Sequence, residues 1–128
     1  MSKGLRVTLY LVSAYLAFFG ILFAFAPRVF EQMTGSKLLD PELTLLYGQY
    51  TLTFAYVAFA AARRKAPNEL SLTVLVVTAG NAVVFGYLLT TGRQPPSQAG
   101  PPLVVNAVFT VLLLLFRSRA EAVSPRGR

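Results

Sequence analysis

The chain has 128 residues, of which 55% are hydrophobic and 13% are charged. It carries a net charge of +7 and contains neither histidine nor cysteine, which excludes disulfides, thiolate metal ligands and ordinary haem ligation. Four apolar segments fill most of the chain, at residues 7–26, 43–62, 70–89 and 103–116. Because about 20 apolar helical residues cross the hydrocarbon of a bilayer, the composition predicts an all-α integral membrane protein.

The first predicted helix covers about residues 6–26. A short basic region precedes it, as in a signal peptide, but no small-residue cleavage site follows it, so we expect it to remain as a span. Pro27 ends this helix, and residues 27–34 are predicted to form a short helix in the outer membrane interface that stops at Gly35. Three of its side chains are expected to face lipid: Val29, Phe30 and Met33.

The second predicted helix covers residues 42–63 and begins with a recognisable start signal. The sequence Asp40-Pro41-Glu42 supplies an N-cap, a proline for the first helical position and an acidic side chain for the first turn. In the same way, Asn68-Glu69 begins the third predicted helix, at residues 69–91. Both starts are therefore well defined by local chemistry.

The last part of the chain begins with an irregular external loop, predicted at residues 92–102 because glycine and proline recur there. The fourth helix is predicted at about residues 101–119, with Pro101-Pro102 suited to its first turn. Residues 120–128 are expected to be a disordered cytoplasmic tail. The chain thus reads as one domain, residues 1–128, with four transmembrane helices.

Lysine and arginine are distributed unevenly about the predicted spans, nine on one side and three on the other. The nine are Lys3, Arg6, Arg63, Arg64, Lys65, Arg117, Arg119, Arg126 and Arg128, and the three are Arg28, Lys37 and Arg93. The positive-inside rule therefore predicts an antiparallel four-helix bundle in the cytoplasmic (inner) membrane, with both termini in the cytoplasm. The expected partner of these charges is the lipid bilayer and not nucleic acid, because aromatic residues do not alternate with them.

Small side chains recur at helical spacing in three of the predicted spans, where they allow helices to approach closely. They are Ser13, Ala17 and Gly20 in the first span, Gly48 and Ala55 in the second, and Thr78, Ala82 and Gly86 in the third. The fourth span lacks such a seam and is expected to face lipid or a partner. Helix packing is the favoured interpretation of the seams, and lining of a substrate path is the alternative.

Three amides, Gln49, Asn81 and Asn106, are the most polar groups inside the spans, and Tyr47 and Tyr50 add hydroxyls beside the first of them. An amide in hydrocarbon costs free energy unless it is paired. One interpretation is that the amides form interhelical hydrogen bonds. The other is that they line a small pocket for the headgroup of a lipid, a quinone or a sterol-like ligand.

The four apolar segments contain no ionisable Asp, Glu, His, Cys, Lys or Arg. General acid-base catalysis and proton-coupled transport ordinarily need such a group, so we expect no enzyme activity, no metal and no cofactor. Glu31, Asp40 and Glu42 are predicted near the external surface. The last two have capping roles, which makes a catalytic site there a minor alternative.

The first half of the chain resembles small bacterial four-span membrane proteins of the DoxX-like and DUF4345-like type. The resemblance runs over residues 10–64 and, more loosely, through the third span; it is carried by residues 17–27 (AFFGILFAFAP), 30–35, 46–48 and 60–64. The fourth span lacks the acidic residue of the DUF4345-like pattern. A more distant similarity is to sterol-isomerase-like four-helix bundles, whose membrane carboxylates are missing here. The resemblance implies a four-helix fold and no particular activity.

These observations favour a non-catalytic role, either as an accessory or scaffold subunit or as a binder of an apolar ligand. A scaffold would contact a membrane-protein partner or further copies of itself as a homo-oligomer, through the seams that contain Gly48 and Gly86. A ligand would occupy the pocket of the three amides. A small transporter or channel is the alternative function, and a membrane lipid-modifying enzyme is the third.

Overall fold

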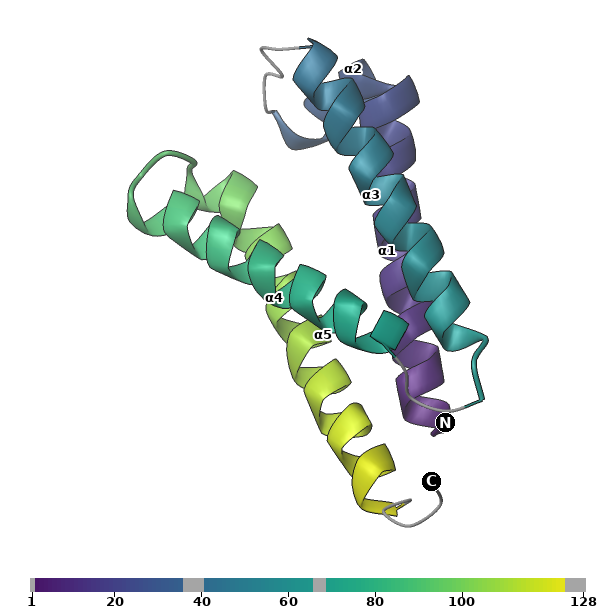
Figure 1. Cartoon of the computed structure of the whole chain (residues 1–128). Helices are drawn as coiled ribbons and strands as arrows, with labels where there is room; N and C mark the ends of the chain where they lie inside the picture. The colour runs from purple at the N-terminus through teal and green to yellow at the C-terminus, as the bar shows by residue number, and fades with distance from the viewer. Residues whose placement is uncertain (1, 36–40, 66–68, 124–128) are drawn as a thin grey trace.

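A computed structural model describes residues 2–35, 41–65 and 69–123. Over these ranges the chain forms helices and no strand, in the order α1 (Lys3–Phe25), α2 (Pro27–Thr34), α3 (Pro41–Ala62), α4 (Glu69–Thr90) and α5 (Pro96–Val123). The two most extensive helix contacts are α1 with α3 and α4 with α5. The long helices therefore pair as two antiparallel hairpins, which diverge toward α2 (Figure 1).

Three helical segments are long and apolar enough to cross a membrane, namely α1, α4 and residues 96–119 of α5. α3 has a comparable length of 22 residues but is not among them. Its sequence carries one glutamine, three tyrosines and three threonines, which lower its hydropathy. The four predicted spans are thus four long helices, of which three meet the usual criterion for a span.

The predicted short helix after the first span is confirmed: α2 covers Pro27–Thr34 and ends at Gly35, whose φ of 71° is left-handed. Glycine adopts this conformation without the steric cost that a Cβ would add. Val29 and Met33 are exposed as predicted, whereas Phe30 turns inward and its ring lies 4.5 Å from that of Phe23. The proposed caps at Asp40 and Asn68 lie outside the described residues.

The prediction of a loop through residue 102 is wrong, because α5 already begins at Pro96 and contains Pro101 and Pro102. A proline costs a helix one backbone hydrogen bond and crowds the preceding turn. Here the two prolines lie in the second turn of the helix, and small residues, Ala99 and Gly100, directly precede them. The helix also continues to Val123, beyond the predicted start of the tail.

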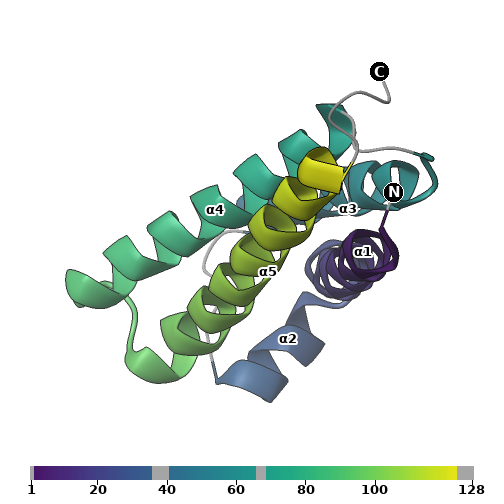
Figure 2. The same cartoon turned by 90° about the horizontal axis from the view of Figure 1, so that it is seen from below.

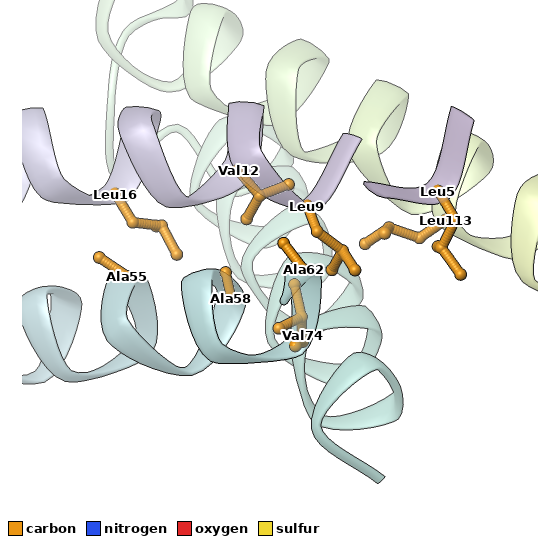
Figure 3. Packing of buried hydrophobic residues seen from close by; sticks show 10 residues of the cluster. Leu5, Leu9, Val12, Leu16, Ala55, Ala58, Ala62, Val74 and Leu113 are labelled. Carbon is orange, nitrogen blue, oxygen red and sulfur yellow. The ribbon is translucent and has the colours of Figure 1, made fainter. Parts of the chain in front are cut away.

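The main apolar core fills the contact between α1 and α3. Large aliphatic side chains of α1 lie over alanines of α3, and one side chain from each of α4 and α5 closes the cluster (Figure 3). Its labelled members are Leu5, Leu9, Val12, Leu16, Ala55, Ala58, Ala62, Val74 and Leu113. Because Leu113 and Val74 reach this core from the second hairpin, it also joins the two hairpins.

Glycines bring α1 and α3 into backbone contact farther along the same interface. A Cβ on Gly48 would lie 2.7 Å from the backbone nitrogen of Ala24 and 3.0 Å from the carbonyl oxygen of Gly20. A Cβ on Gly20 would meet the side chain of Leu52 at 2.8 Å. Small residues on both helices allow this close approach.

The second hairpin contacts the first in two places, through α4 with α3 and through α5 with α1. Seen from below, α5 lies beside α4, and α3 lies beside α1, near one end of α4 (Figure 2). Phe116 of α5 packs against this core, and a Cβ on Gly4 of α1 would fall within 2.8 Å of its ring. The fourth span, which was expected to face lipid or a partner, therefore also contacts α1, through large side chains and without a small-residue seam.

Candidate functional site

The α4–α5 contact contains the one pair of predicted site residues that the structure brings together. The Asn81 Nδ2 donates to Asn106 Oδ1 at 3.4 Å, and the Asn106 Nδ2 donates to the backbone carbonyl of Pro102 at 2.8 Å. Asn106 is 2% exposed, and Asn81 is half-buried. Both polar atoms of the Asn106 amide are thus used within the hairpin, as the packing interpretation requires.

The same contact continues with hydroxyl groups. The Thr110 hydroxyl lies 3.1 Å from that of Thr78 and 2.8 Å from the carbonyl oxygen of Asn106, and Thr78 donates to the carbonyl of Leu75 at 3.0 Å. Because Thr110 has one hydroxyl proton, it serves one of its two acceptors at a time.

One further bond lies on this line, from Arg117 Nε to Ser71 Oγ at 3.3 Å. From the second hairpin's turn to its open end, the three pairs are therefore Asn81–Asn106, Thr78–Thr110 and Ser71–Arg117. They form a polar seam between α4 and α5.

The other predicted pocket residues lie elsewhere. Gln49 and Tyr50 are exposed on α3, in the part of that helix from which α4 and α5 diverge (Figure 1). Tyr47 is also on α3, and its ring packs at 5.1 Å against Phe23 of α1. The structure thus joins two of the three amides and leaves Gln49 away from them.

The predicted packing residues divide into close and ordinary contacts. Ser13 donates to the carbonyl oxygen of Ala55 at 2.7 Å, which ties α1 directly to α3. Ala17 and Ala82 are half-buried. A Cβ on Gly86 would find its nearest neighbour, Leu103 Cδ1, at 3.8 Å, which is ordinary contact distance. The seam at Gly48 is therefore a close backbone approach, and that at Gly86 is not.

Sequence reasoning missed an aromatic cluster along α1, which we call the aromatic column. It consists of Tyr15, Phe19 and Phe23 of α1, Phe30 of α2, Tyr47 of α3 and Phe109 of α5. Its ring centroids are 4.5 to 6.4 Å apart, within the range of favourable aromatic pairs. The spacing of four residues between Tyr15, Phe19 and Phe23 was the available signal, because such residues share one helix face.

Basic residues gather where α1 begins and where α3 and α5 end, at one end of the molecule (Figure 1). We call it the basic end; its described members are Lys3, Arg6, Arg63, Arg64, Lys65, Arg117 and Arg119. The Arg63 guanidinium lies 5.7 Å from the ring centroid of Phe59. At the opposite end, Arg93 stacks in the same way on Tyr87 at 5.6 Å. The uneven distribution of charge in the sequence thus corresponds to one strongly basic end of the folded chain.

Within the described parts of the chain, no group of three or more His, Cys, Asp or Glu side chains lies close enough to hold a metal ion. No protein-family profile, characterised protein or solved structure matches the chain.

Proposed function

We propose that the chain is a four-span protein of the cytoplasmic membrane, with both termini in the cytoplasm, and that it acts as a non-catalytic accessory or scaffold subunit. Three helical segments have the length and composition of spans. Most of their exposed side chains are aliphatic or aromatic, as a lipid-facing surface requires. The exposed aliphatic side chains support placement of the chain in a membrane. The hydrogen bonds among the inner polar groups support a non-catalytic accessory role.

The assignment of α3 as the fourth span follows from its contact with α1. The Ser13–Ala55 hydrogen bond, the alanine core and the Gly48–Ala24 approach occur along most of the α3 length. Its 22 residues correspond to about 33 Å of helix, enough to cross the hydrocarbon. If α1 crosses the membrane, α3 crosses beside it.

The direction of insertion can be tested in spheroplasts with single-cysteine variants, because the chain has no cysteine of its own. A membrane-impermeant maleimide should label Arg93→Cys directly and Arg64→Cys only after permeabilisation. This follows from the positive-inside rule and from the position of Arg64 at the basic end. The reverse pattern would show that the orientation is wrong.

The main support for an accessory role is that the polar groups between the helices form hydrogen bonds with one another or with backbone. Asn106 and Asn81 bond to each other, Thr78 contacts Thr110, and Ser13 bonds to backbone. Polar groups that are committed to helix contacts hold the fold together and are not free to bind a solute. A scaffold uses its outer surface instead.

Purification from native membranes in mild detergent tests this role. We expect the chain to leave the membrane in a complex of fixed stoichiometry that survives size-exclusion chromatography. A chain that elutes as a monomer, without a protein partner and without a bound ligand, would contradict the proposal.

The aromatic column favours a second candidate function, binding of an apolar ligand that contains a ring. Aromatic faces stack on flat rings, and Tyr47 adds a hydroxyl at the column's outer part. Native mass spectrometry should then detect one bound species that is lost in Phe23→Leu and kept in Phe25→Leu, since Phe25 is exposed outside the column. Equal retention by both variants would argue against this site.

A further inference from the structure

α3 carries two stripes of residues on opposite faces. The first stripe is buried against α1 and consists of Thr44, Gly48, Thr51, Ala55, Ala58 and Ala62. The second, which we call the outer stripe, consists of Leu46, Gln49, Thr53, Tyr56 and Ala60. Both follow the alternating spacing of three and four residues that forms a continuous seam on a helix. A helix with two such seams is built to contact a neighbour on each side.

Most of the outer stripe is exposed within the described chain, and only Ala60 is half-buried. Gln49 and Thr53 are exposed, and Tyr56 is 71% exposed. Tyr50, beside the stripe, is 57% exposed. The Thr53 hydroxyl donates to the carbonyl of Gln49, so its own proton is used inside the helix. The Gln49 amide has no such bond.

Gln49 would lie within the hydrocarbon if α3 spans the membrane. It is eight residues from Pro41, or about 12 Å along a helix of about 33 Å. An amide that faces acyl chains there has no water with which to bond. Asn81 of α4 and Asn106 of α5 reduce this cost by pairing. The same physics requires a hydrogen-bonding partner for Gln49.

We propose that the outer stripe of α3 is the interface at which two copies of this chain form a dimer. The inference rests on the proposed membrane placement. Copies with the same orientation are related by a twofold axis along the membrane normal, so that their α3 helices run parallel and each stripe residue faces its counterpart. Such symmetry places Gln49 opposite Gln49, and an amide both donates and accepts, so the two side chains satisfy each other.

The basic residue that follows the stripe is compatible with a parallel arrangement of two α3 helices. Arg63 continues the same spacing after Ala60 but lies at the basic end, where the chain leaves the hydrocarbon. Its counterpart in a second copy has like charge, which water, salt and anionic headgroups screen at this level. The apolar and amide part of the stripe ends before these charges begin.

Disulfide cross-linking in native membranes tests the interface, because each cysteine introduced is the only one in the chain. Gln49→Cys and Thr53→Cys should each give, on oxidation, a product of twice the chain mass. Val83→Cys is the matched control, since Val83 of α4 is 72% exposed but lies outside the stripe. Cross-linking of Val83→Cys as efficient as that of Gln49→Cys would overturn the proposal.

A second measurement isolates the amide. Gln49→Leu keeps the size and exposure of the side chain but removes the hydrogen bonds, and should lower the dimer association constant in liposomes roughly 3- to 20-fold. Gln32→Leu alters an exposed glutamine of α2 and should leave association unchanged. An unchanged association constant for Gln49→Leu would refute the role of the amide pair. Both substitutions are at the surface, so melting curves should match those of the unmodified chain.

The outcomes separate this inference from the proposed function. A cross-linked product of another mass would show that a different protein, and not a second copy of this chain, contacts the outer stripe. The accessory role would then still hold. If the cysteine variants at all stripe positions remain monomeric on oxidation, the proposed dimer is wrong. Loss of the chain from membranes on a carbonate wash would instead overturn the membrane placement on which both depend.

Discussion

Replacement of Gly48 by alanine should weaken the α1–α3 hairpin, and the structure lets the size of the effect be estimated. The added Cβ would lie 2.7 Å from the backbone nitrogen of Ala24, about 0.7 Å short of the 3.4 Å at which ordinary contact begins. The obstacle is backbone, so the two helices must move apart. Overpacking of this kind costs about 2 to 3 kcal/mol, against about 1 kcal/mol gained from the higher helix propensity of alanine.

Gly80→Ala is the matched control, because Gly80 is also inside a long helix but a Cβ there would meet nothing within 4 Å. The propensity gain is common to both substitutions, so their difference isolates the packing cost. We expect Gly48→Ala to lower the free energy of unfolding by about 1 to 2 kcal/mol and Gly80→Ala to raise it by up to about 1 kcal/mol.

The free energy of unfolding can be measured by titration with denaturing detergent from lipid bicelles, with helix content and intramolecular fluorescence transfer as readouts. Gly86→Ala should behave like Gly80→Ala, since its nearest neighbour would be 3.8 Å away. If Gly48→Ala and Gly80→Ala had the same effect, α1 and α3 would not approach as closely as described, and the reasoning would fail.

Two further predictions concern hydrogen bonds and use the same titration. Asn106→Ala should lower the free energy of unfolding by about 1 to 3 kcal/mol, because it removes two hydrogen bonds of a buried amide. Asn81→Ala should lower it by less than about 1 kcal/mol. Equal losses would contradict the conclusion that Asn106 is the more strongly bonded of the two. Ser13→Ala should cost about 1 kcal/mol through loss of the 2.7 Å bond to Ala55. Ser118→Ala, at an exposed position, should leave the free energy of unfolding almost unchanged. If it lowered this energy as much as Ser13→Ala does, the loss at Ser13 could not be assigned to the hydrogen bond with Ala55.

Local signals predicted the helices well where a single residue decides the backbone. Pro27 and Gly35 set the limits of α2 because one fixes φ and the other tolerates a positive value. The same reasoning failed at Pro101 and Pro102, which lie inside α5. Whether a helix accepts a proline depends on the space around the preceding turn, and the sequence does not contain that information.

The candidate site was predictable only in part. The amides were identified as the significant polar groups, but their pairing depended on the register of α4 against α5, which sets Asn81 against Asn106 and leaves Gln49 alone. The aromatic column likewise needed α2 to fold back so that Phe30 reaches Phe23. Contacts between residues far apart in sequence follow from the packing of whole helices and not from local propensity.

The sequence by itself determined the helical class, the apolar length of the segments and the uneven charge, because these depend on composition and on spacing along one chain. The tertiary structure decided which face of each helix is covered. It placed the small residues of α3 against α1 and left the outer stripe around Gln49 exposed, although both stripes have the same spacing. A helix presents several equivalent faces to its surroundings, and only the neighbouring helices select among them.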